Sequence, residues 1–398
     1  MTELDRFEAL LDPRGKEILR RLDRSAVTPD TVLRISTALR SEFPPDLVAD
    51  ALSQHELRQQ ARTKFAAADR MFFTRSGLEQ ASAETIAGYR ATRYAGLGRI
   101  ADLCCGIGGD LVTLAREHEV LAVDRDPLHL RVAQANAAVS GVGDHVLPVL
   151  ADVRDAALPG VEAVFIDPAR RQGGQRLRTG ASEPPLEWCW ALADRIPQVG
   201  VKAAPGLPHE AVPDGWETEF VALGRELKEA TVWSPPLATT ARRATVFPGG
   251  HTLTSAPGAP LSVRAPGDHL CDPSPAVTRA GLVQELGRQL GAWQIDRQIA
   301  FLSADVPLRT PFGRALRVVE SGPWNQKRLP ATLRALDIGS VDIRRRGLAG
   351  DVDQLRRQLK LTGSRRAIVV MTRVENRPWG LICLDDEWDE QRPVSAGA

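Results

Sequence analysis

Apolar and polar positions form a repeating pattern between residues 99 and 171. Short apolar runs of strand length are separated by segments whose apolar residues recur with helical spacing. Strands that alternate with helices are typical of an α/β fold with a parallel sheet, in which ligands bind at the carboxyl ends of the strands. The pattern predicts strands at 100–104, 120–123, 146–150 and 161–166, and helices at 111–116 and 128–136.

The N-terminal part of the chain has a helical pattern. From residue 4 to about residue 95, apolar residues such as Phe7, Leu10 and Ile18 recur with helical spacing, and Pro29 is placed as in the first turn of a helix. The pattern predicts a small helical domain. This domain either packs as a cap on the α/β domain or contacts the substrate, and the sequence leaves both possibilities open.

The C-terminal part follows a third pattern. Its order of strand, helix, strand, helix and two strands predicts a small two-layer α+β domain. The segment 254–275 is rich in Pro, Gly and Ser and is typical of a linker, and a helix is predicted at 275–290. The predicted domains are a helical domain at 1–95, an α/β domain at 96–250, a linker with a helix at 251–300, and the α+β domain at 301–398.

Composition narrows the class of protein. Of 398 residues, 43% are hydrophobic and 25% are charged, which is ordinary for a globular protein with a full core. The net charge is +1, so any surface for a polyanion must be local. No apolar run approaches the length of a membrane span, and the acidic segment 1–5 is unlike a secretory leader. The five cysteines show no paired metal spacing, so we expect a reducing cytoplasm, no membrane and no metal.

A glycine-rich loop follows the first predicted strand, and an acid ends the second. Gly106 and Gly108 let the backbone approach a ligand closely, and Asp124 is placed to accept hydrogen bonds from ribose hydroxyls. A dinucleotide fingerprint requires a third glycine where this chain has Leu111, and Asp102 would repel a pyrophosphate. Asp102 suits a positive amino group instead. The residues therefore favour S-adenosylmethionine, which has an amino group and a ribose but no phosphate, over a nicotinamide dinucleotide.

The segments 102–110 and 122–127 resemble the motifs of class I S-adenosylmethionine-dependent methyltransferases. Within this class the chain is most similar to the trimethylguanosine-synthase-like branch and to bacterial methyltransferases with a C-terminal THUMP-like domain. Residues 72–74, 77–82 and Asn136 share in this likeness. The resemblance implies a Rossmann-like sheet, S-adenosylmethionine as the cofactor, and a ferredoxin-like or THUMP-like C-terminal domain. It places the donor against Thr74, Asp102, Cys104, Gly106, Gly108, Asp124, Arg125, Asp152 and Val153.

Two of these donor positions have a specific expected role. The resemblance places Thr74 near the methionine end of the donor. Asp152 ends the third strand, where its carboxylate is placed to accept the adenine amino group beside the Val153 backbone. A lone acid after a strand is often a helix cap, which is the alternative interpretation of Asp152.

The fourth strand ends in Asp-Pro-Ala-Arg at residues 167–170. Methyltransferases that act on exocyclic base nitrogens carry Asp, Asn or Ser here, followed by two prolines and an aromatic residue. Asp167 and the Pro168 carbonyl match that pattern and would accept hydrogen bonds from the amine, whereas Ala169 and Arg170 depart from it. Because an arginine plane can also stack on a base, Asp167, Pro168 and Arg170 are the candidate catalytic residues.

The same strand tip also looks like that of uracil-5 RNA methyltransferases. Those enzymes need a cysteine nucleophile at the end of the next strand. The candidate strand 199–205 has no cysteine, and Cys189 lies in a helical run where we expect it to be buried. Carbon methylation of uracil is therefore not expected. Lys202 at this strand end either meets a phosphate or carboxylate or is solvated.

Basic residues gather in two regions. The loop 172–180 is glycine-rich and basic beside the predicted crevice, and it either closes over a polyanion or is a plain surface loop. Arginine runs at 344–346, 356–357 and 365–366 predict an RNA-facing surface or solvated faces.

We expect methylation of a base nitrogen of RNA, without evident DNA specificity. The alternatives are a protein or small-molecule acceptor and a non-catalytic RNA-binding protein. The RNA-binding candidates are Arg344, Arg345, Arg346, Arg365 and Arg366.

Overall fold

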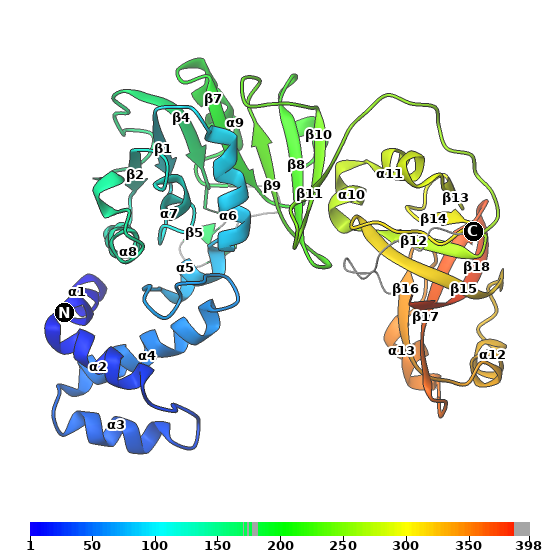
Figure 1. Cartoon of the computed structure of the whole chain (residues 1–398), viewed down its shortest axis with the longest axis horizontal. Coiled ribbons are helices and arrows are strands. Elements are labelled where there is room, and N and C mark those ends of the chain that lie inside the picture. The colour runs from blue at the N-terminus through cyan, green and yellow to red at the C-terminus, as the bar shows by residue number, and fades with distance from the viewer. Residues whose placement is uncertain (170, 173–174, 177–181, 386–398) are drawn as a thin grey trace, which may run out of the picture. The chain divides into compact units, whose positions relative to one another are not determined.

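The computed structural model describes residues 1–169, 171–172, 175–176 and 182–385, and Figure 1 traces the chain through it. The chain forms two compact units. The first unit is Met1–Trp216 with Thr231–Thr239, and the second is Glu217–Ala230 with the chain from Thr240 onward. The chain therefore passes from one unit to the other three times. The boundaries predicted at residues 95, 250 and 300 divide the chain into four segments, and this finer division remains a prediction.

The first unit begins with helices, as predicted. Thr2 closes a capping box at the start of α1, and Pro13 and Pro45 occupy the first turns of α2 and α4, where a missing N–H is tolerated. Ile18 is fully buried in an apolar cluster that joins these helices to Ile107 of the glycine loop. The helices are α1 (Glu3–Leu11), α2 (Pro13–Asp23), α3 (Val32–Arg40), α4 (Pro45–Ala61), α5 (Arg75–Gln80) and α6 (Glu84–Ala91).

Five parallel strands of the first unit lie in the order β3-β2-β1-β4-β7. Leu103 of β1 is level with Val123 of β2 and with Ile166 of β4, so the carboxyl ends of these strands meet at one edge. The chain leaves β1 toward β2 and β3 and then returns to β4 on the other side, which makes this the switch point where open α/β sheets bind ligands. The strands are β1 (Arg99–Leu103), β2 (Val120–Asp124), β3 (Val146–Leu150), β4 (Val161–Ile166) and β7 (Gln198–Ala203).

Apolar clusters cover both faces of this sheet. Ile100 packs in one cluster with Leu111, and its neighbour Ala101 packs in the other with Cys189, as the alternation of side chains along a strand requires. The burial predicted for Cys189 is therefore confirmed. The predicted helix at 111–116 is shorter than expected. The helices are α7 (Leu111–Leu114), α8 (Pro127–Val139) and α9 (Leu186–Ala191).

The second unit begins with two strands that pair in parallel, β8 (Glu217–Leu223) and β10 (Arg242–Phe247), and β11 (His251–Thr254) pairs antiparallel to β10. β9 (Glu226–Trp233) begins in the second unit and ends in the first. The helix predicted at 275–290 is broken in two. Gly281 has a φ of +67°, a left-handed conformation that ends α10 (Pro275–Ala280) before α11 (Val283–Leu290) begins.

A seven-stranded sheet forms the rest of the second unit, in the order β13-β14-β12-β15-β18-β17-β16. Its neighbours are antiparallel except β16 and β17, and the elements from β15 to β18 follow the predicted order. β12 lies within the predicted linker, where Leu270 and Cys271 are fully buried. The elements are β12 (His269–Pro273), β13 (Trp293–Gln294), β14 (Leu302–Ala304), β15 (Gly313–Pro323), α12 (Leu329–Ala335), β16 (Ile338–Arg345), α13 (Val352–Gln358), β17 (Arg365–Val374) and β18 (Arg377–Asp385).

Several small elements complete the described part of the chain. Among the described residues, none of the helices has the length and apolar character that crossing a membrane requires. Two short strands, β5 (Arg171–Gln172) and β6 (Gln175–Arg176), pair antiparallel after β4. Short 3-10 helices lie at Thr92–Tyr94, Gly143–His145, Leu192–Asp194 and His209–Ala211.

Candidate functional site

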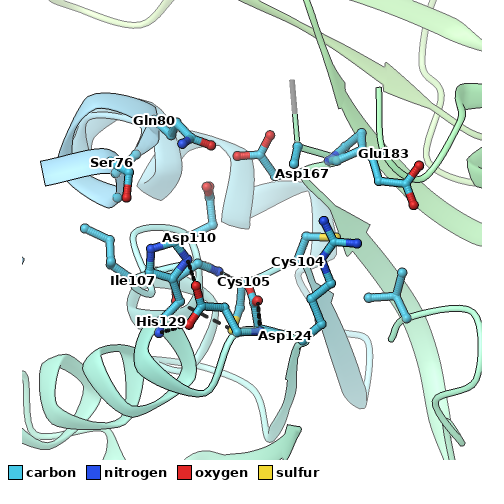
Figure 2. Close-up of a pocket in the computed structure, with 18 of the residues that line it drawn as sticks. Ser76, Gln80, Cys104, Cys105, Ile107, Asp110, Asp124, His129, Asp167 and Glu183 are labelled. Carbon is cyan, nitrogen blue, oxygen red and sulfur yellow. Dashed lines mark hydrogen bonds and ion pairs between the residues drawn. The ribbon is translucent and has the colours of Figure 1, made fainter. Parts of the chain in front are cut away.

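A cavity of about 380 Å³ lies at the carboxyl ends of β1, β2 and β4, at the switch point of the sheet (Figure 2). Thr74, Asp102 and Gly108, all predicted to hold the donor, do not line it. Arg170 lies outside the described residues. The predicted site residues that do line the cavity are Cys104, Gly106, Asp124, Arg125, Asp152, Val153, Asp167 and Pro168.

The loop between β1 and α7 depends on backbone conformations that favour glycine. Gly106 and Gly108 have φ values of +54° and +86°, in the left-handed region. A Cβ added at Gly108 would lie 3.2 Å from the Cα of Ala133 in α8, so glycine permits close packing of the loop on that helix. Cys104 also has a positive φ, +60°, which is uncommon for a residue with a side chain. The loop is therefore held in a demanding conformation beside the cavity.

Asp124 fastens this loop to the end of β2. Its Oδ2 accepts a hydrogen bond from the Gly106 N–H at 2.8 Å, and its Oδ1 accepts one from the Asp126 N–H at 2.9 Å. The side chain is buried but lines the cavity, where Figure 2 labels it close to the loop. Each carboxylate oxygen has a second lone pair, so both bonds are compatible with acceptance from a ribose diol.

Asp102 lies beneath the cavity and not on its wall. The side chain is almost fully buried, and its Oδ2 has no hydrogen-bond partner among the described residues. Burial raises the pKa of Asp102 well above its usual value, and the neighbouring carboxylates of Asp110, Asp167 and Asp124 raise it further. A buried carboxyl with an unsatisfied oxygen suits a cationic neighbour, and the charge of Arg90 already acts on it in that sense.

Asp110 is a cavity residue that the sequence analysis missed. It lines the cavity and forms a buried ion pair with Arg90 of α6. Arg90 also lies over the ring of Phe165, 4.8 Å from its centroid. The sequence marks Asp110 only as the acid that follows the glycines. Its partner Arg90 lies twenty residues earlier in the chain, so the spacing of neighbouring residues does not predict the pair.

Thr74 borders the cavity without lining it. Its hydroxyl caps α5 by accepting the Gly77 N–H at 3.0 Å, and it lies 3.2 Å from Nε2 of His129 in α8. Ser76 and Gly77 from the same turn do line the cavity, together with His129. The segment that contains Thr74 therefore reaches the cavity. Thr74 itself does not line the cavity but contacts two residues that do, Gly77 and His129.

Asn136 explains why the segment 72–74 lies beside the glycine loop. Its amide accepts the Phe72 N–H at 2.7 Å and donates to the carbonyls of Phe72 at 2.9 Å and Ile107 at 2.8 Å. Asn136 is fully buried. Phe72 and Phe73 are also buried, so these aromatics are core residues and not ligand contacts.

Asp152 is held by an arginine that the sequence analysis did not single out. Arg154 donates to both carboxylate oxygens of Asp152, at 2.9 and 2.8 Å, and to Glu183 at 2.7 Å. Arg154 lowers the pKa of Asp152 to about 2, so the carboxylate stays ionised and able to accept hydrogen bonds at neutral pH. Glu183 in turn forms a β-bridge with Ala169, which places the start and the end of the loop after β4 side by side.

The tip of β4 carries an ion pair with β7. The Asp167 N–H donates to the Leu103 carbonyl at 3.2 Å, and the Lys202 ammonium lies 2.6 Å from Asp167 Oδ2. Lys202 is buried, so its partner is a carboxylate rather than solvent.

Burial raises the pKa of Cys189 to about 12, and this thiol is therefore not a nucleophile at neutral pH. The described residues contain no cluster of His, Cys, Asp or Glu that could hold a metal.

The arginine runs of the second unit do not form a single cluster. Arg366 pairs with Asp342 at 2.8 Å, and Arg365 donates to the Leu336 carbonyl at 3.4 Å. Arg366 is level with Ser340 of β16, so Arg344 lies four residues further along that strand, a separation of about 13 Å. The structure thus brings Arg344 and Arg346 together, but not with Arg365 and Arg366.

Sequence families match three parts of the chain. The RNA cap guanine-N2 methyltransferase family matches residues 97–178, and the THUMP domain-like family matches residues 313–384. A domain of unknown function matches residues 3–61. The first match covers strands β1 to β4 with the glycine loop, and the second covers the strands from β15 to β18.

Known proteins resemble most of the chain. An uncharacterized S-adenosylmethionine-dependent methyltransferase of Mycobacterium tuberculosis (strain CDC 1551 / Oshkosh) is 39% identical over 320 residues, which are 76% of this chain and 84% of that protein. The counterpart in strain ATCC 25618 / H37Rv matches equally. A crystal structure from Porphyromonas gingivalis W83, described as that of a methyltransferase, has the same fold, with a TM-score of 0.73 and 19% identity over 93% of this chain and 98% of that one. The chain therefore belongs to the S-adenosylmethionine-dependent methyltransferases, with an α/β domain of the RNA cap guanine-N2 methyltransferase type and a C-terminal THUMP-like domain.

Proposed function

We propose that this methyltransferase modifies a base nitrogen of RNA. The observation that carries the proposal is the position of Asp167 and Pro168, which line the donor cavity at the carboxyl end of β4. A carboxylate and a proline carbonyl at this strand tip suit an exocyclic base amine, which has two hydrogens to donate. The family matches to an RNA cap methyltransferase domain and a THUMP-like domain support RNA as the carrier of that base.

The residues around the cavity suit S-adenosylmethionine. When bound, this cofactor supplies an electrophilic methyl group on a sulfonium. Asp102 suits the amino group because its buried Oδ2 has no partner among the described residues. The loop at Gly106 and Gly108 would follow the methionine part near Thr74 and Cys104, and Asp124 would accept the ribose hydroxyls. The adenine would lie by Asp152 and Val153, with Arg125 at the rim.

Asp167 would orient the accepting amine. Its carboxylate is fixed by the buried Lys202 ammonium, so one oxygen has a set direction while the other remains able to accept a hydrogen bond. Asp167 and the Pro168 carbonyl would together aim the nitrogen lone pair at the donor methyl group. Alignment of two bound reactants accounts for roughly 7–11 kcal/mol of barrier lowering in favourable cases. Arg170 would stack on the base in place of the usual aromatic residue.

The test is methyl transfer from labelled donor to separate pools of total RNA, total protein and small-molecule extract. We expect label in nuclease-sensitive RNA and in a base whose exocyclic nitrogen is methylated. Asp167→Ala should abolish this label while donor binding, measured by calorimetry, remains within about twofold, because the carboxylate acts on the acceptor. Label in protein or extract alone would overturn the proposal. Donor binding without transfer to any pool would favour a non-catalytic RNA-binding protein.

A further inference from the structure

A second cavity, of about 680 Å³, lies wholly within the second unit. None of its lining residues belongs to the donor cavity. Its polar wall comes from segments that are distant in the sequence. They are the turn between β8 and β9, the end of β12, the start of β15 and the ends of β16 and β18. The cationic residues of this wall are Arg225, Arg314, Arg344 and Arg346.

Strand geometry selects which arginines of the run 344–346 reach this cavity. Side chains alternate across a strand, so Arg344 and Arg346 share a face and Arg345 points to the other. Arg344 and Arg346 both line the cavity, whereas the Arg345 guanidinium donates to the Gly350 carbonyl. Arg346 also lies over the ring of Phe301, 5.0 Å from its centroid, which limits its freedom.

Two carboxylates orient three of these guanidiniums. Asp272 lies 2.8 Å from Arg346 and 3.9 Å from Arg344, and both oxygens of Asp385 accept hydrogen bonds from Arg314. Four arginines and two aspartates on the wall leave a surplus of two positive charges. The carboxylates thus preorganise the arginines without neutralising them.

The arginines of this wall are only partly satisfied. Nη1 of Arg314 and Nε of Arg344 are buried atoms with no hydrogen-bond partner among the described residues, and the nearest carboxylate oxygen given for Arg344 Nε is that of Asp272, at 3.9 Å. Arg225 has no ion-pair partner in the described part of the chain. Partial burial lowers the pKa of Arg225, the charges of Arg314 and Arg344 lower it further, and those of Asp385 and Asp342 raise it, so charges of both signs act on this guanidinium. An anion in the cavity would offset the positive charge of these arginines.

We propose that this cavity binds a phosphate group of the RNA substrate. The inference rests on the proposed function for the identity of the polymer. Guanidinium groups match phosphate oxygens with paired donors, and several converging arginines with a net positive charge suit a phosphate better than a neutral base or sugar. The phosphate is either a backbone phosphodiester or a terminal monophosphate, since both present the same oxygens.

The test compares matched charge changes in the full-length protein. The double variant Arg225→Gln/Arg344→Gln removes two cavity arginines, and Arg328→Gln with Arg334→Gln removes two exposed arginines that do not line the cavity. Neither pair includes Arg314 or Arg346, which hold Asp385 and Asp272. The probe is a fluorescein-labelled single-stranded RNA of about 20 nucleotides, with a 5′-hydroxyl or a 5′-monophosphate, and binding is followed by anisotropy at several salt concentrations.

We expect the cavity variant to bind the RNA at least about fivefold more weakly and to lower the salt slope by about 1–2, whereas the control variant stays within about twofold. A phosphodiester ligand would give the same loss with both probes, and a terminal phosphate would give a larger loss with the 5′-monophosphate probe. Equal losses in the two variants would overturn the cavity assignment and indicate a diffuse charge effect. Because this measurement involves no methyl transfer, its result is independent of whether RNA is methylated.

Discussion

Asp124 joins the conformation of the glycine loop to the proposed recognition of the ribose. It holds the Gly106 and Asp126 N–H groups, so removing it would loosen the loop and delete the diol acceptor together. We expect Asp124→Ala to weaken S-adenosylmethionine binding by at least about tenfold in calorimetry, the size of one or two lost charge-assisted hydrogen bonds. Asp124→Asn should lose less because it keeps one acceptor oxygen. Unchanged affinity in Asp124→Ala would refute the ribose assignment.

Asp102 gives donor binding a pH dependence. Burial, with the charges of Asp110, Asp167 and Asp124, raises its pKa, so the free protein favours the protonated carboxyl below that raised value. An amino cation placed beside Asp102 lowers its pKa again, and binding then releases a proton. Donor affinity should therefore rise with pH up to the raised pKa and level off above it, because the ionised form is the one that binds.

Proton release is measured by calorimetry in buffers of different ionisation enthalpy. We expect release by the wild-type protein at a pH below the raised pKa of Asp102, and none by Asp102→Asn, whose side chain has the same shape and no proton to lose. If the binding enthalpy measured for the wild-type protein is the same in all buffers, no proton is released. Asp102 would then not hold the amino group.

At the scale of elements, Asn136 connects α8, the segment 72–74 and the glycine loop. Replacing it with alanine leaves the Phe72 N–H and the carbonyls of Phe72 and Ile107 without partners in a buried place. We expect Asn136→Ala to lower the free energy of unfolding by about 3 kcal/mol in urea denaturation. Gln134→Ala, on the same helix, is the control and should cost less than about 1 kcal/mol. Similar costs for the two variants would show that the connection is not structurally important.

The sequence predicted those elements whose signals are local. Strand periodicity and the glycines at 106 and 108 predicted the parallel sheet, the loop and part of the cavity wall, because each feature depends on neighbouring residues. The same patterns gave the order of elements from β15 to β18. Gly281 was a local signal as well, yet its left-handed conformation is not visible in the apolar spacing that predicted one helix.

The missed features depend on partners that are far apart in the chain. Arg154 meets Glu183 across 29 residues, and Lys202 meets Asp167 across 35, so nothing local predicts either pair. The sequence also does not record which face of a strand each arginine occupies, or how far apart two arginine runs lie along paired strands. Which distant residues form an ion pair, and which face of a strand a side chain occupies, depend on the fold. Only the structure supplies this information.

At the scale of the whole molecule, the chain passes between its two units before residue 250, where a domain boundary is predicted. The second unit contains β8, β10 and β11 as well as the chain beyond them, and α10 packs against β8 and β10. Phe220 of β8 is fully buried and lies under Arg279 of α10, 5.6 Å from the guanidinium carbon to the ring centroid. A cut at the boundary predicted from sequence would therefore remove part of the cover of these strands.

We expect a fragment of residues 1–250 to bind the hydrophobic dye ANS and to unfold without a sharp transition, because β8 and β10 lose the helix that covers them. The full-length chain is the control and should bind little dye and unfold cooperatively. The measurements are dye fluorescence and thermal unfolding by circular dichroism. If the fragment instead unfolds sharply and binds S-adenosylmethionine as tightly as the full chain, residue 250 is a true domain boundary. Residues 217–250 would then fold without the rest of the second unit.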